Sequence, residues 1–124
     1  MFKFSERSEQ LLNTVHKDLG RVAQEVIKIS KVDFGIVYGL RDVNTQQKLF
    51  YAGKSQCDGI KIKSKHQDGL AIDIMCYING EGTWDKKYYY YVAGLFEAKA
   101  KELNININWG GWWSFEDCGH FEIA

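Results

Sequence analysis

The order of helix-like and strand-like hydrophobic patterns is the feature that most constrains how this chain can fold. Three segments carry helical signals, namely residues 6–30, 45–52 and 85–103. Four segments have the composition or alternation of strands, namely residues 33–39, 70–76, 104–109 and 119–123. Because these segments do not follow the regular rhythm of βαβ units, they predict an α+β domain with a small, mainly antiparallel sheet packed against helices.

Several details of these segments are predicted as well. Gly20 leaves two interpretations of residues 6–30 open, one long helix or two shorter ones. Residues 79–82 predict a turn, and residues 104–109 alternate so strictly that they form the clearest strand pattern in the chain. The predicted buried stripe of the 85–103 helix consists of Tyr88, Tyr91, Val92, Leu95 and Ala98.

Charge and cysteine content narrow the class of protein. Lys plus Arg and Asp plus Glu each total 16, so the formal net charge is zero, which argues against nucleic-acid binding. Three cysteines, Cys57, Cys76 and Cys118, cannot all pair with one another, so we expect a reducing folding compartment. The N-terminal residues are charged and no window approaches the ~18 apolar residues of a membrane span, so we expect neither a signal peptide nor membrane insertion.

A histidine and an acid lie around the predicted strand at residues 70–76. His66 lies in the polar approach to this strand, and Asp73 lies on the face opposite its apolar residues. A buried carboxylate without a partner would cost several kcal/mol, so Asp73 needs a cation or hydrogen-bond donors. Gly69 and Ala71 are small and leave room on the same face, so the arrangement suits a metal ion.

The residues near the C-terminus carry the other candidate ligands. In an extended chain His120 and Glu122 point to one side and Phe121 to the other. Asp117 precedes Gly119, where a turn can swing its carboxylate toward His120. Two histidines and one aspartate form a three-ligand set that leaves a fourth zinc position for water, and Asp117 then supplies a general base that is not a ligand.

Each of these residues also has an ordinary structural interpretation. A lone histidine near a strand is more often hydrogen-bonded than metal-binding, Asp73 could cap a segment or pair with a lysine, and Asp117 could form a turn. From spacing alone, a metal site and these structural roles are about equally favoured.

Two motifs change that balance. They are Ser64-x-His66-x-x-Gly69-x-Ala71-x-Asp73 and, further along, Trp109-Gly110-Gly111 with Asp117-x-x-His120-Phe121-Glu122. Together they resemble the VanY-type zinc murein peptidases, and within that group the phage L-alanyl-D-glutamate endopeptidases. Weaker upstream matches extend the resemblance from about residue 11 to the C-terminus. The resemblance implies the D-Ala-D-Ala carboxypeptidase/hedgehog-like fold, with a zinc site on the sheet, and one catalytic domain over residues 1–124 without a separate cell-wall-binding domain.

The resemblance also assigns roles to particular residues. The zinc ligands that it implies are His66, Asp73 and His120. It implies that Asp117 is the catalytic base and that Arg41 and Ser64 contact the substrate or polarise its carbonyl. Gly119 and Lys17 stand where the family often has proline, which affects backbone stiffness rather than chemistry.

Two other features leave questions for the structure. Cys118 would share the face of His120 and compete for zinc if the final strand began early, whereas we expect His16 to be structural. Trp109 is expected in the core, and at least one of Trp112 and Trp113 faces outward. These outer tryptophans fit a wall of the substrate cleft and packing over the sheet edge about equally well.

The expected function is therefore a zinc metallopeptidase that cuts the peptidoglycan stem peptide, at the L-Ala–D-Glu bond, as a phage endolysin. One alternative is a D,D-carboxypeptidase or dipeptidase with the same metal set, and another is a binding module that keeps the zinc but not the reaction. We expect a monomer that stays in the host cytoplasm until a separate lysis factor releases it to the cell wall.

Overall fold

The computed structural model describes residues 1–124 and confirms the predicted α+β class. The helices are α1 (Glu6–Leu12), α2 (Lys17–Ile29), α3 (Val43–Tyr51) and α4 (Lys86–Glu102), with the short 3-10 helices η1 (Lys65–Asp68) and η2 (Gly110–Trp112). The strands are β1 (Asp33–Tyr38), β2 (Ala71–Ile78), β3 (Glu81–Thr83), β4 (Ile107–Trp109) and β5 (His120–Ile123). None of these helices combines the length and apolar character that a membrane crossing requires.

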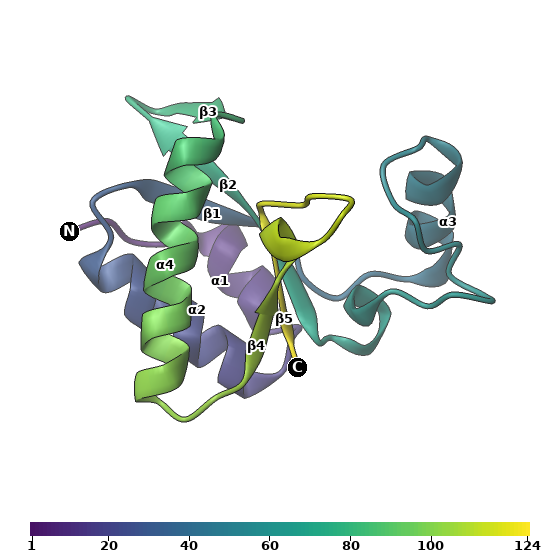
Figure 1. Ribbon diagram of the computed structural model, residues 1–124, viewed down its shortest axis with the longest axis horizontal. Coiled ribbons are helices and arrows are strands. Elements are labelled where there is room, and N and C mark those ends of the chain that lie inside the picture. The colour runs from purple at the N-terminus through teal and green to yellow at the C-terminus, as the bar shows by residue number, and fades with distance from the viewer.

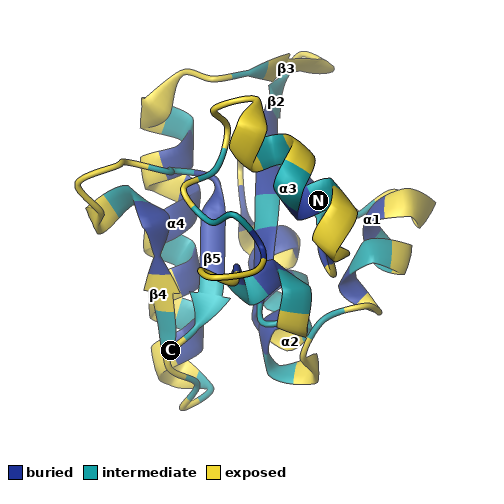
Figure 2. Ribbon diagram, turned by 90° about the vertical axis from the view of Figure 1, so that its right-hand side faces the viewer, coloured by how far each residue is buried: buried dark blue, intermediate teal, exposed yellow.

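The five strands form one antiparallel sheet in the order β1-β2-β5-β4, and β3 pairs with β2 beside this path. Helices α2 and α4 lie on one side of the sheet, whereas α3 stands on the other side with the loop that follows it (Figure 1). In the view onto that other side, β2 and β5 lie behind α3 and its loop (Figure 2). α3 and the connecting loops therefore lie over this face of the sheet.

The core fills the space between the sheet and helices α2 and α4. Alternation along β2 sends Ile72, Ile74 and Cys76 into this core, where each is at most 2% exposed. Phe121 of β5 stacks on Phe96 of α4 with ring centroids 4.0 Å apart. Because side chains alternate along both strands, the residues between these core positions point to the face that carries α3.

The N-terminal helical segment is two helices, but Gly20 does not separate them. Gly20 lies inside α2, and the break falls at residues 13–16. There His16 caps α2 through its Nδ1, which accepts a hydrogen bond from the Asp18 N–H at 3.1 Å, while its own N–H donates to the Gly69 carbonyl at 2.8 Å. His16 is thus structural, as predicted, and a contact distant in sequence sets the helix boundary.

The buried face of α4 differs from the predicted stripe. The buried residues are Tyr89, Val92, Ala93, Phe96 and Ala100, so that only Val92 of the predicted set is fully buried. Four consecutive tyrosines give this helix aromatic residues on every side, so periodicity does not select one face. Tyr89 turns inward because its hydroxyl finds partners there, donating to the Thr83 carbonyl at 2.8 Å and accepting from the Cys76 N–H at 3.1 Å.

One predicted strand is shorter than expected, whereas the predicted turn at residues 79–82 is confirmed. The segment 104–109 is a strand only over Ile107–Trp109, since Asn104 adopts a left-handed conformation with φ 59° after α4. The predicted turn at residues 79–82 is the tip of a β2–β3 hairpin, where Asn79 and Gly80 both have positive φ, which suits a tight two-residue connection.

Candidate metal centre

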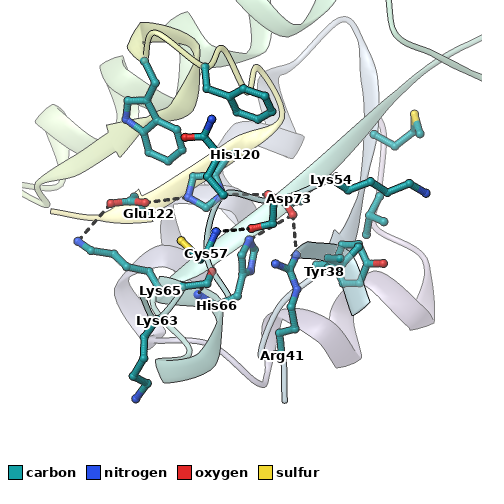
Figure 3. A pocket seen from close by; sticks show the side chains of 18 of the residues that line it. Tyr38, Arg41, Lys54, Cys57, Lys63, Lys65, His66, Asp73, His120 and Glu122 are labelled. Carbon is teal, nitrogen blue, oxygen red and sulfur yellow. Dashed lines mark hydrogen bonds and ion pairs between the residues drawn. The ribbon is translucent and has the colours of Figure 1, made fainter. Parts of the chain in front are cut away.

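The sheet register brings the three predicted ligands together. Asp73 of β2 lies directly opposite His120 of β5, and both side chains point into the same pocket (Figure 3). His66 comes from η1, which Ser64 begins by accepting a hydrogen bond from the His66 N–H and Gly69 ends with φ 69°. One ligand atom from each of His66, Asp73 and His120 lies within 4.8 Å of the others, so the three side chains form a candidate metal-binding triad (Figure 3).

Hydrogen bonds on the outer sides of the two rings fix their orientation. His66 Nδ1 lies 3.0 Å from the Gly39 carbonyl oxygen, and His120 Nε2 lies 2.8 Å from a Glu122 carboxylate oxygen. Glu122 is in turn paired with Lys65 at 3.2 Å. Such outer partners fix the tautomer of a metal-binding histidine and raise its basicity. The other nitrogen of each ring, His66 Nε2 and His120 Nδ1, therefore faces Asp73.

The two facing atoms of His66 and Asp73 are better suited to binding a cation between them than to a direct hydrogen bond. His66 Nε2 is buried and has no hydrogen-bond partner, although it lies 3.2 Å from Asp73 Oδ2. Because His66 Nδ1 donates to a carbonyl, the neutral ring carries a lone pair at Nε2, which faces a carboxylate that also only accepts. A metal ion between these two atoms would satisfy both.

The charges of the triad are strongly coupled. Burial alone would raise the pKa of Asp73, but the hydrogen bond and the positive charge of His120 hold this pKa far below its usual range. Burial alone would lower the pKa of His120, but Asp73 on one side and Glu122 on the other raise it to about 9. Without a metal, the proton on His120 therefore supplies the positive charge between the two carboxylates.

Asp117, the predicted base, lies in the loop before β5. Its backbone is held on both sides, since its N–H donates to the Gly110 carbonyl at 2.9 Å and its carbonyl accepts from the His120 N–H at 3.2 Å. Burial and the negative charge of Asp73 raise the pKa of the Asp117 carboxyl. A raised carboxyl pKa is the property that a general base needs to take up a proton near neutral pH.

Arg41 lies in the wall of the site but is already engaged. One guanidinium nitrogen donates to Asp73 Oδ2 at 3.0 Å, and another donates to Gln46 Oε1 at 2.8 Å. The guanidinium also lies over the Tyr38 ring, 4.4 Å from its centroid, and Arg41 is only 6% exposed. The structure thus shows Arg41 orienting Asp73, while the substrate contact that the sequence predicted stays a prediction.

Ser64 and Cys118 also have observed local roles. Ser64 lines the cavity, but its hydroxyl oxygen caps η1 together with Gln67 in a capping box. The final strand begins only at His120, so the condition under which Cys118 would share the face of that ligand is not met. Instead the Cys118 thiol donates to Glu116 at 2.9 Å, and burial together with Glu116 raises the pKa of this thiol to about 12.

A cavity of about 760 Å³ contains the triad. Three basic side chains, Lys54, Lys63 and Lys65, are among the residues that line it. Aromatic side chains, Trp84, Trp113 and Phe115, line it as well, and the Trp113 ring centroid lies 4.9 Å from that of His120. The three tryptophans at residues 109–113 therefore lie in different places: Trp109 is buried in the core, Trp113 lines this cavity, and Trp112 is 75% exposed outside it.

Three groups that orient the site residues were not among the predicted site residues, namely Glu122, Gln46 and the Gly39 carbonyl. The two-residue spacing along a strand predicts Glu122 on the face of His120, and this spacing is the signal for their hydrogen bond. Gln46, which is fully buried against Arg41, and the Gly39 carbonyl, which orients His66, gave no such signal. Their contacts join elements that are distant in sequence, so only the fold reveals them.

A triad of this kind, which lines a cavity near the half-buried Asp117, defines a small α+β domain with a candidate metal centre. Comparison with known proteins makes the class specific. The model of the phage L-alanyl-D-glutamate peptidase family matches residues 1–124, and the chain belongs to this family. The protein is therefore a peptidase.

Two relatives support this assignment. The chain is 38% identical over 123 residues to the L-alanyl-D-glutamate peptidase of Escherichia phage T5, covering 98% of this chain and 89% of the phage protein. It is also similar to the crystal structure of the L-Ala D-Glu endopeptidase ChiX of Serratia marcescens, with 34% identity and a TM-score of 0.88, over 99% of this chain and 90% of the other.

Proposed function

We propose that this protein is a zinc endopeptidase that hydrolyses the L-alanyl-D-glutamate bond of the peptidoglycan stem peptide, and that His66, Asp73 and His120 hold the zinc ion. The observation that carries the proposal is the triad itself, in which one nitrogen of each histidine is tied to an outer acceptor and the other faces Asp73. Family membership and the two relatives named above support the substrate.

The chemistry of the donor set favours zinc among the common metals. Two imidazole nitrogens and one carboxylate are a usual ligand set for catalytic zinc, with a further position open to water. When bound, the ion would supply Lewis acidity that polarises the scissile carbonyl and makes a water molecule more acidic.

The residues of the chain would carry the proton transfers and the alignment. Asp117, with its raised pKa, would take the proton of the attacking water and deliver it to the leaving amine of the D-glutamate residue. Arg41 and Gln46 would hold Asp73 in one orientation. The lysines that line the cavity, Lys54, Lys63 and Lys65, suit the carboxylates of a stem peptide.

Two further parts of this proposal rest on the family resemblance. The protein would act as an endolysin during host lysis, remaining in the host cytoplasm until a separate lysis factor releases it. The wider relation to VanY-type zinc murein peptidases belongs to the same proposal.

The test combines metal analysis with product analysis on one preparation. We expect one zinc ion per chain, loss of activity on chelation and its return on addition of zinc. Digestion of purified murein should create a new free amine on glutamate, which mass spectrometry would identify. Release of D-alanine instead would indicate the D,D-carboxypeptidase alternative, and a zinc-loaded protein without any product would indicate a binding module.

The matched variant for the proton transfer is Asp117→Asn, which keeps the shape of the side chain and removes its basicity. We expect turnover to fall about a hundredfold or more, while the zinc content stays at one per chain. Equal turnover of the variant and the wild type would contradict the assignment of Asp117.

A further inference from the structure

We propose that a second groove, on the outer side of the loop that carries Asp117, binds the glycan strand of peptidoglycan. This outer groove has a volume of about 320 Å³ and lies between α4 and residues 109–116. The inference rests on the proposed function, because it assigns a binding site to another part of the same polymer.

The outer groove offers a rigid aromatic platform. Trp112 is 75% exposed, yet its indole N–H donates to Glu97 at 3.1 Å and its ring packs edge-on against Trp109 at a centroid distance of 5.4 Å. An exposed indole held at both ends presents a flat apolar face at little cost in conformational entropy. The C–H groups on one face of a pyranose ring stack on such a surface.

Gly94 leaves the floor of the groove open. This glycine lies inside α4, where glycine costs about 1 kcal/mol relative to alanine. A Cβ atom at Gly94 would meet no atom within 4 Å, so the packing of the protein does not require a glycine there. The missing side chain instead leaves free space beside Trp112, which a ligand could fill.

Charge distinguishes the outer groove from the cavity that contains the triad. The groove is lined by Glu97 and by Glu116, which is paired with Lys86 at 3.2 Å, whereas three lysines line the cavity. Burial of the peptide carboxylates in the groove would therefore be unfavourable, while the hydroxyl and N-acetyl groups of a neutral amino-sugar strand can donate to its acids. The charges assign the acidic stem peptide to the cavity and the neutral glycan to the groove.

The two sites are neighbours along the chain and along the substrate. Trp112 belongs to the outer groove, and the next residue, Trp113, lines the cavity 4.9 Å from the His120 ring. In peptidoglycan the L-alanine is attached directly to the muramic acid, so the sugar lies one residue from the scissile bond. Specific glycan contacts also suit a protein of zero net charge, which has no cationic excess to hold it on an anionic wall.

The experiment compares two substrates that share the scissile bond. One is purified murein, and the other is an N-acetylated stem peptide that lacks the sugar. We expect Trp112→Ala to lower kcat/KM on murein about three- to tenfold and to leave the sugar-free peptide unaffected. Tyr51→Ala, which removes an aromatic side chain that is 79% exposed on α3, is the matched control and should change neither rate.

A second variant fills the groove without removing any contact. Gly94→Leu should raise the thermal stability, since leucine is a better helix former than glycine, and yet lower the rate on murein. Tetra-N-acetylchitotetraose should shift the NMR signal of the Trp112 indole N–H in the wild type and not in Gly94→Leu.

The possible outcomes separate this inference from the proposed function. Unchanged rates on murein for both variants, equal losses on both substrates, or no shift with the tetrasaccharide would overturn the glycan site while leaving the peptidase assignment intact. Failure of the wild type to cut either substrate would overturn the proposed function as well.

Discussion

The charge on His120 in the metal-free protein leads to a pH dependence that can be measured directly. His120 has its pKa raised to about 9 because it lies between Asp73 and Glu122, at 3.0 and 2.8 Å. Its unfolded value is about 6.5. Since the folded pKa is the higher one, the stabilisation is fully present below pH 6.5 and is lost as the pH rises through 9.

The size of this effect follows from the shift in pKa. One pKa unit corresponds to about 1.4 kcal/mol, so the difference between 6.5 and about 9 amounts to roughly 3 kcal/mol of unfolding free energy. The depressed pKa of Asp73 acts in the opposite direction and only at low pH, where stability is lost as the pH falls below about 3.8. The metal-free protein should therefore be most stable between about pH 4 and 6.5.

The assay is urea unfolding of the protein in the presence of a chelator, at pH 6.5, 7.5, 8.5 and 9.0. We expect the free energy of unfolding to decrease steadily over this range, and a histidine NMR titration should show one ring that loses its proton near pH 9. Glu122→Gln removes one of the two carboxylates, so its curve should be flatter. The same unfolding free energy at pH 6.5 and 9.0, together with a His120 titration near 6.5, would refute this account of the site.

Three further predictions concern the surroundings of the triad. Arg41→Ala should lower zinc affinity about 10- to 100-fold, because Asp73 loses the guanidinium that orients it. Competition with a chromophoric chelator would measure this affinity, and an unchanged value would contradict the positioning role of Arg41. Cys118→Ser should leave zinc content at the wild-type level by elemental analysis, since the thiol only donates to Glu116, and a loss of zinc would make Cys118 a ligand. Gly110→Ala should destabilise by about 1–3 kcal/mol in thermal unfolding, because its Cβ would overlap the Asp117 carbonyl oxygen and lie 3.0 Å from His120 Cβ. Gly94→Ala, which meets open space, is its control and should be neutral or stabilising.

The chain itself determined most of the elements and the candidate site. Alternation along residues 70–76 and 119–123 predicts Asp73 and His120 on the face opposite the core residues, and the β2–β5 register agrees. The two spaced motifs identified the family, because their residue types and intervals are specific. These features are local, so period and spacing suffice to read them.

Tertiary structure decided what depends on contacts between distant segments. It chose the buried face of α4, where four tyrosines in a row left periodicity ambiguous, and it turned Arg41 toward Asp73 and Gln46. It also places the adjacent residues Trp112 and Trp113 in two different sites, Trp112 in the outer groove and Trp113 in the cavity that contains the triad. A sequence pattern specifies which side of a helix or strand a residue occupies, but the partner it meets there depends on packing of the whole chain, because a buried polar group takes whichever donor or acceptor the fold brings within reach.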